Sequence, residues 1–176
     1  MKSATLVAAA LLAISTTASA GGYLGIGLGS TPSVNDGFDS IAKPFGRSLR
    51  GLAGLRFANV SVEAALNGFN VTTQRGDQTV YQGSVALKLS LPLGSGFEGF
   101  ARGGLERTWL SFDDSTFDFT GDGFLVGAGF EFRLNAILAD ASIFVDYTFH
   151  KATLDNTQGS VDTSSGMWGL GLTVGL

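Results

Sequence analysis

The chain contains no cysteine, one histidine and only three prolines among its 176 residues. Without cysteine it can form neither a disulfide framework nor a thiolate metal site. A single histidine also supplies few nitrogen ligands for a transition metal. We therefore predict that the protein holds no metal and no other cofactor.

Basic residues are scarce as well. Eleven Lys and Arg stand against fifteen Asp and Glu, which gives a net charge of −4, and the basic residues are scattered along the sequence. Nucleic-acid-binding proteins concentrate basic residues on one surface. We predict no nucleic-acid partner.

Long apolar runs are missing after the N-terminal region. The apolar run at residues 4–14 follows Lys2 and precedes small residues at 18–20. It is shorter than the roughly 20 residues of a membrane-spanning helix, and it has the form of a secretory signal. We predict a signal peptide at residues 1–20, cleaved after Ala20, and one domain at residues 21–176.

Glycine, in contrast, is abundant, with 26 residues. Residues 165–176 read SGMWGLGLTVGL, so one face of an extended strand is apolar and the other is mostly glycine. Residues 21–30, GGYLGIGLGS, have the same arrangement. Bare glycine suits the crowded interior of a small barrel whose apolar side chains face lipid. We predict that these first and last strands are neighbours and close the sheet.

In eight segments of the chain, apolar residues alternate with residues that would face the interior of the barrel. Polar stretches at 31–47, 70–79, 111–122 and 151–164 alternate with short turns at 58–59, 92–96 and 134–137. Outer-membrane barrels combine long extracellular loops with short periplasmic turns in this way. The predicted fold is all-β: a membrane-embedded, eight-stranded antiparallel up-and-down barrel.

The inward positions of these strands carry charges of both signs. An eight-stranded barrel has a lumen just wide enough for side chains to fill it, so we predict a charge network that closes the lumen and prevents general porin activity. The tight turn at 58–59 would make Arg56 and Glu63 diagonal cross-strand neighbours. In the alternative, a soluble exported carrier of the lipocalin type, the same charges would face water. The predicted network comprises Arg50, Arg56, Glu63, Lys88, Glu98, Arg102, Glu106, Glu131, Arg133, Asp140 and Asp146.

The signal sequence, the eight strands and the final strand WGLGLTVGL together resemble the small OmpA-like barrels of Gram-negative outer membranes, a group that includes the OmpX and Ail types. The resemblance implies an outer-membrane location, in contact with lipid and lipopolysaccharide. It also implies that the barrel-assembly machinery reads the last strand, although family members usually end in an aromatic residue and this chain ends in Leu176. The implied function is envelope structure, or adhesion to a host or envelope protein through the loops.

Some eight-stranded outer-membrane barrels, the lipid A deacylases and palmitoyltransferases, are enzymes, so catalysis is an alternative. His150 would lie at the extracellular end of its strand, with Asp146 below it on the same face. Ser142 shares that face but lies about 27 Å away at about 3.4 Å per residue. The deacylase-like His-x-Ser is absent, because Lys151 and Ala152 follow the histidine. We predict a rim histidine bonded to its neighbours and no enzyme activity.

Two surface features complete the prediction. Arg107 and Trp109 point outward near the outer end of their strand, as an interfacial anchor or as a contact between the guanidinium and a lipopolysaccharide phosphate. The aspartates of 111–122 and 151–164 do not have the spacing of an EF-hand, so we predict a solvated acidic surface. Phe112, Phe117 and Phe119 mark either a partner contact or an extension of the neighbouring strands above the membrane.

Overall fold

The computed structural model describes residues 21–35, 42–74, 76–110, 119–136, 139–156 and 159–176, so the predicted signal peptide lies outside the described residues. Within these ranges, no helix has the length and apolar character needed to cross a membrane. The regular elements are strands: β1 (Gly21–Gly29), β2 (Ser33–Asn35), β3 (Ala42–Phe57), β4 (Val60–Thr73), β5 (Gly76–Gly94), β6 (Phe97–Leu110), β7 (Phe119–Ala136), β8 (Ala139–Asn156) and β9 (Gly159–Gly175).

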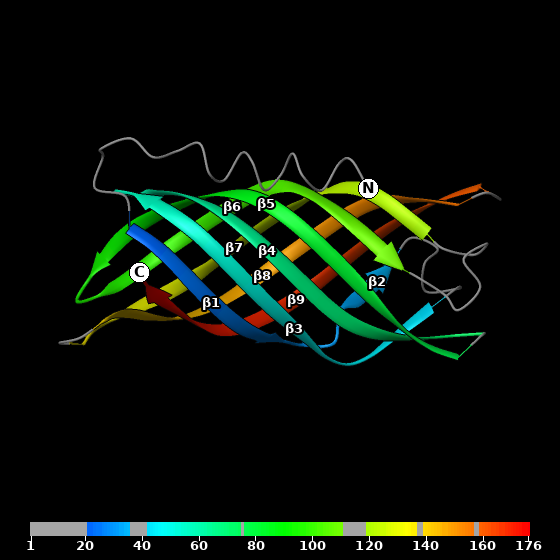
Figure 1. Ribbon diagram of the computed structural model, residues 1–176, viewed down its shortest axis with the longest axis horizontal. Helices are drawn as coiled ribbons and strands as arrows, with labels where there is room; N and C mark the ends of the chain where they lie inside the picture. The colour runs from blue at the N-terminus through cyan, green and yellow to red at the C-terminus, as the bar shows by residue number, and fades with distance from the viewer. Residues whose placement is uncertain (1–20, 36–41, 75, 111–118, 137–138, 157–158) are drawn as a thin grey trace.

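The eight long strands form one closed antiparallel ring. From β3 to β9 each strand pairs with the next along the chain, and β1 pairs with both β3 and β9. Figure 1 shows the strands strongly tilted and wrapped around a common axis. The short strand β2 continues along β9 beyond the end of β1. The predicted eight-stranded antiparallel barrel is confirmed.

The seam between β1 and β9 is made of nearly bare backbone on its inner side. Gly27 lies opposite Gly171, and Gly29 opposite Gly169. A Cβ at Gly171 would contact the Phe144 ring and lie 2.5 Å from the Ile26 carbonyl oxygen. Only glycine therefore lets the two strands and the Phe144 ring approach so closely, and the predicted pairing of first and last strands is confirmed.

An apolar band surrounds the barrel. On β6, Phe97 and Leu105 are exposed, whereas Glu98, Phe100 and Glu106 are buried in the lumen, so the predicted register of this strand is correct. Exposed apolar side chains on the outer face of a barrel suit contact with lipid. The band includes Ile26, Leu49, Leu66, Leu87, Leu89, Leu91, Leu105, Phe130, Val145, Trp168 and Leu170.

The strands extend beyond this band, and the prediction of long loops is wrong for most of the described residues of those segments. Strand β4 runs to Thr73, and β8 and β9 stay paired as far as Asn156 and Gly159. The described parts of the segments 70–79 and 151–164 are therefore largely strand, as are residues 42–47 and 119–122. Their outward residues are mostly polar, and this polarity resembles that of a loop.

These outer parts form a second layer of the barrel, which we call the distal extension: residues 42–47, 69–73, 76–80, 110, 119–122, 151–156 and 159–164, with β2. Its interior is apolar, because Phe69, Val71, Val80, Leu110 and Leu154 pack together with 4% exposure or less. Phe119 packs against this cluster, so it belongs to a strand extension; Phe112 and Phe117 lie outside the described residues. We call the opposite end of the barrel, where the 58–59 turn and Leu176 lie, the terminal end.

Candidate functional site

The lumen between the two ends contains a network of buried charges. Six strands each contribute one side chain, because the charged residues occupy inward positions of the two-residue strand repeat. These side chains are between 0 and 7% exposed. They are Arg50 on β3, Glu63 on β4, Lys88 on β5, Arg102 on β6, Glu131 on β7 and Asp146 on β8.

Asp146 is the anion of the distal half of this network. Its Oδ2 lies 2.8 Å from Arg50 Nη1, and it also accepts a hydrogen bond from Arg102 Nη2. Arg50 Nε donates to Asn67 Oδ1 over 3.0 Å. Because the Asp146 carboxylate is fully buried, removing either guanidinium would leave its negative charge less well paired in a medium of low polarity, which is destabilising.

Lys88 connects the rest of the network. Its Nζ lies 2.6 Å from Glu131 Oε2 and 3.3 Å from Glu63 Oε1. Glu63 also lies 3.5 Å from Arg102 Nη1 and accepts a hydrogen bond of 2.6 Å from the Tyr23 hydroxyl. The ion pairs therefore form a continuous path across the lumen from Arg50 to Glu131.

A cavity of about 610 Å³ lies at the terminal end of the lumen. Glu98 lines it and pairs with both Arg56 and Arg133, at 2.8 Å each. Asp140 lines the same cavity. The backbone of Arg56 lies opposite Ser61, which places Glu63 on the expected diagonal, but the guanidinium pairs with Glu98 instead.

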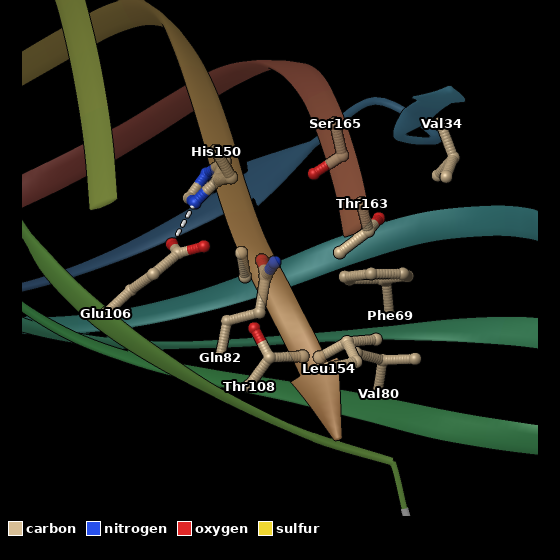
Figure 2. Close-up of a pocket in the computed structure, with 11 residues that line it drawn as sticks. Val34, Phe69, Val80, Gln82, Glu106, Thr108, His150, Leu154, Thr163 and Ser165 are labelled. Atoms are coloured by element: carbon tan, nitrogen blue, oxygen red, sulfur yellow. Dashed lines mark hydrogen bonds and ion pairs between the residues drawn. The ribbon is translucent and has the colours of Figure 1, made fainter. Parts of the chain in front are cut away.

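His150 does not lie at the rim, so this prediction is wrong. Strand β8 continues six residues further, and the imidazole is buried at 2% exposure. Its Nδ1 contacts Glu106 Oε2 rather than Asp146 (Figure 2). The histidine and Glu106 are thus enclosed between the charge network and the apolar cluster of the distal extension.

The sequence interpretation missed the side chains that surround this pair. A cavity of about 20 Å³ is lined by polar Gln82, Glu106, Thr108, His150, Thr163 and Ser165 and by apolar residues. In Figure 2 Glu106, Gln82 and His150 lie on one side and Phe69 and Val80 on the other, with Thr163 beside Phe69. The available signal was the two-residue repeat itself, which turns apolar Phe69, Val71 and Val80 inward.

Arg107 and Trp109 lie on the outside of β6. The Arg107 guanidinium is 48% exposed and lies 3.6 Å from Asp122, while the Trp109 ring covers Gly83. Asp122, Asp155 and Asp162 are exposed, and Asp113, Asp114 and Asp118 lie outside the described residues. Among the described residues, no group of three or more His, Cys, Asp or Glu side chains could hold a metal ion.

Comparison with protein families decides the class of this barrel. The model of the family "Outer membrane protein beta-barrel domain" matches residues 3–175. The chain belongs to this family. Membership implies the outer membrane of a Gram-negative bacterium and contact with its lipids, and it rules out the soluble carrier. No curated protein matches the sequence at a significant level.

Two solved structures of the same fold cover nearly the whole domain. Neisserial surface protein A (NspA) is 16% identical, with a TM-score of 0.64 over 87% of this chain and 96% of its own. Ail, the attachment invasion locus protein of Yersinia pestis, in complex with the heparin analogue sucrose octasulfate, is 15% identical, with a TM-score of 0.55 over 89% of this chain and 99% of its own. At these identities, the likeness shows the fold alone.

Proposed function

We propose that this outer-membrane barrel acts in envelope structure and surface interaction, with a lumen closed to solutes. The terminal end faces the periplasm and the distal extension faces the exterior, as the short turns and extended hairpins of such barrels do. The observation that carries the proposal is the two-layered filling of the lumen. A bundle of ion pairs joined across six strands lies below an apolar cluster whose members are almost fully buried.

Either layer alone hinders the passage of ions. Moving an ion through the charge network requires breaking pairs such as Arg50–Asp146 and Lys88–Glu131, and each separated charge would be poorly solvated. The apolar cluster around Leu110 and Leu154, each 1% exposed, offers a passing ion no polar group. In this proposal, the cavity of about 610 Å³ at the terminal end is therefore a vestibule that stops at the charge network and does not continue through the barrel.

Single-channel recording in planar bilayers tests this closure. The protein should give no large, stable conductance. A variant with three shortened side chains, Arg102→Ala, Leu110→Ala and Leu154→Ala, should conduct more, because it removes filling from both layers. A large, stable conductance of the unmodified barrel would contradict the proposal.

For surface interaction, we propose a protein partner that contacts the outward face of the distal extension. The relative Ail was crystallised with a polyanion. In contrast, the described part of the β8–β9 hairpin exposes Asp155 and Asp162 beside one lysine, Lys151, and this excess of negative charge repels polyanions. Bacteria carrying Asp155→Asn and Asp162→Asn should adhere less to host cells than the parent strain, and heparin should not compete. Unchanged adhesion would contradict the role of these hairpins.

We propose that the protein is not an enzyme, because the His150 side chain is enclosed and pairs with Glu106. Ser142, the hydroxyl considered as a nucleophile, lines the cavity at the terminal end. Mass spectrometry of lipid A from cells expressing the protein or its His150→Ala variant should give identical spectra. A lipid A species lost in the variant would favour the lipid-modifying alternative.

We also propose two envelope contacts. The exposed Arg107 guanidinium binds a lipopolysaccharide phosphate, so Arg107→Ala should lower the thermal unfolding midpoint in membranes that contain lipopolysaccharide and leave it unchanged in phospholipid alone.

Strand β9 is the signal for the assembly machinery, and Leu176 at its end is 82% exposed. Replacing Leu176 by Phe should raise the yield of assembled barrel in cells.

A further inference from the structure

The cavity beside His150 contains an unusual set of buried polar atoms. Four atoms have no hydrogen-bond partner within the described ranges: Gln82 Oε1, Glu106 Oε1, Thr108 Oγ1 and His150 Nε2. Their residues are between 2 and 5% exposed. They come from the paired strands β5 and β6 and from β8, and they line the same cavity (Figure 2). Buried polar groups in folded proteins are rarely left without a partner, so these four atoms point to a ligand.

The size of the space restricts that ligand. The cavity measures about 20 Å³, and about 10 to 15 Å³ of such volume is enough for one water molecule. Larger solutes do not fit. A buried water also needs two to four polar partners. The four atoms without a partner supply that number, and the side chains of Thr163 and Ser165 also line the cavity.

The balance of donors and acceptors restricts it further. Gln82 Oε1 and Glu106 Oε1 only accept hydrogen bonds, whereas Thr108 Oγ1 can donate one. His150 Nε2 donates or accepts, depending on which ring nitrogen carries the proton. A water molecule both donates and accepts hydrogen bonds, so it suits this mixed set of atoms.

We propose that this cavity binds one water molecule, which hydrogen-bonds with Gln82, Glu106, Thr108 and His150 and thereby connects Glu106 with His150. Although the site lies inside a lumen proposed to be closed, the proposed water does not depend on that closure, because it is inferred from the cavity and its four atoms. The bound water connects β5, β6 and β8 at the boundary between the charge network and the apolar cluster.

The other charged groups near His150 already have partners. Arg50, Glu63 and Arg102 line an adjacent cavity with His150, and both guanidinium groups are paired with Asp146. Glu106 is therefore the carboxylate that faces His150 directly. A metal cation is the competing occupant, and it would need lone pairs from His150 Nε2 and Thr108 Oγ1.

The test uses the whole barrel in lipid nanodiscs, with ¹⁵N-labelled histidine. The chain has one histidine, so its ring signals need no assignment. A nuclear Overhauser effect should connect bulk-derived water with the ring. The absence of this effect, or spectra that change on chelation or on addition of Zn²⁺ or Na⁺, would overturn the proposal.

Variants separate the water from general packing. Thr108→Val should abolish the water signal, whereas Thr108→Ser, which keeps the hydroxyl, should retain it. Ser90→Ala is the matched control, because Ser90 is also buried with an unpartnered hydroxyl but does not line this cavity. If Thr108→Val does not fold, Gln82→Leu removes an acceptor instead and should also abolish the water signal. Retention of that signal in whichever of these two variants folds would contradict the proposed bridge.

Discussion

Strand β4 passes through two regions of opposite polarity. Up to Leu66, its outward side chains are apolar, and its inward side chains include Ser61, Glu63 and Asn67. Beyond Gly68, the outward residues are Asn70 and Thr72, whereas Phe69 and Val71 point inward. The membrane segment therefore has a polar lumen and an apolar surface, and the distal extension has the reverse.

This inversion shows that the strand repeat and the polarity of each face are separate properties. Side chains continue to alternate without a break, but the medium outside the barrel changes from lipid to water. Inside, the membrane segment is filled with ion pairs and the distal extension with hydrocarbon. A single ring of strands thus combines the construction of a membrane barrel with that of a water-soluble one.

The largest expected effect concerns the seam of the membrane segment. Replacing Gly171 by Arg should abolish folding, because even a Cβ there would contact the Phe144 ring and the Ile26 carbonyl oxygen. Loss of the heat-modifiable band on electrophoresis would report it. The control is Gly51→Ala, whose Cβ has nothing within 4 Å and which should fold normally. Normal assembly of Gly171→Arg would contradict closure by bare glycine.

The next effect concerns the ion pairs of the membrane segment. Asp146→Asn leaves Arg50 and Arg102 without their shared carboxylate, so the free energy of unfolding should fall by about 3 to 5 kcal/mol. Urea titration in lipid vesicles measures it. Asp122→Asn, which breaks an exposed pair at 3.6 Å, should change stability by less than about 1 kcal/mol. Equal effects of the two variants would argue against a buried network.

A substitution in the apolar interior of the distal extension should destabilise that region and leave the membrane segment intact. Leu154 is 1% exposed, and Leu154→Ala should cost about 2 to 5 kcal/mol through lost burial and a new cavity. Hydrogen exchange should become faster in the distal extension while the membrane segment keeps its protection. Leu87→Ala, on the lipid face, is the control. Uniform acceleration over both regions would show that they unfold as one unit.

The smallest expected effect concerns the outward faces of the two regions, which should differ in how much an introduced arginine lowers stability. Leu87 is 58% exposed within the apolar band, and Leu87→Arg should destabilise the barrel by about 2 to 4 kcal/mol in a bilayer. Thr72→Arg, on the outer face of the distal extension, should change stability by no more than about 0.5 kcal/mol. Vesicle unfolding experiments compare them directly. If Thr72→Arg were the more harmful variant, the boundary of the membrane segment would be misplaced.

Sequence reasoning succeeded where the pattern is local. The alternation in residues 165–176 and 21–30 predicted the seam, and the repeat of β6 placed Leu105 outside and Glu106 inside. It failed in the distal extension, because polar outward residues such as Asn70 and Thr72 occur in loops as often as on the water-facing side of a strand. For the same reason it ended β8 at His150 and placed this residue at the rim.

The sequence by itself determined which side chains share a face of each strand, since the two-residue period is a property of the extended backbone. It also determined that the first and last strands could approach closely. Only the tertiary structure decided which charges meet: Arg50 and Asp146 are 96 positions apart, and Glu106 and His150 are 44 apart. The physical reason is that ring closure and strand tilt bring opposite walls within ion-pair distance, and no local pattern in the chain encodes that distance.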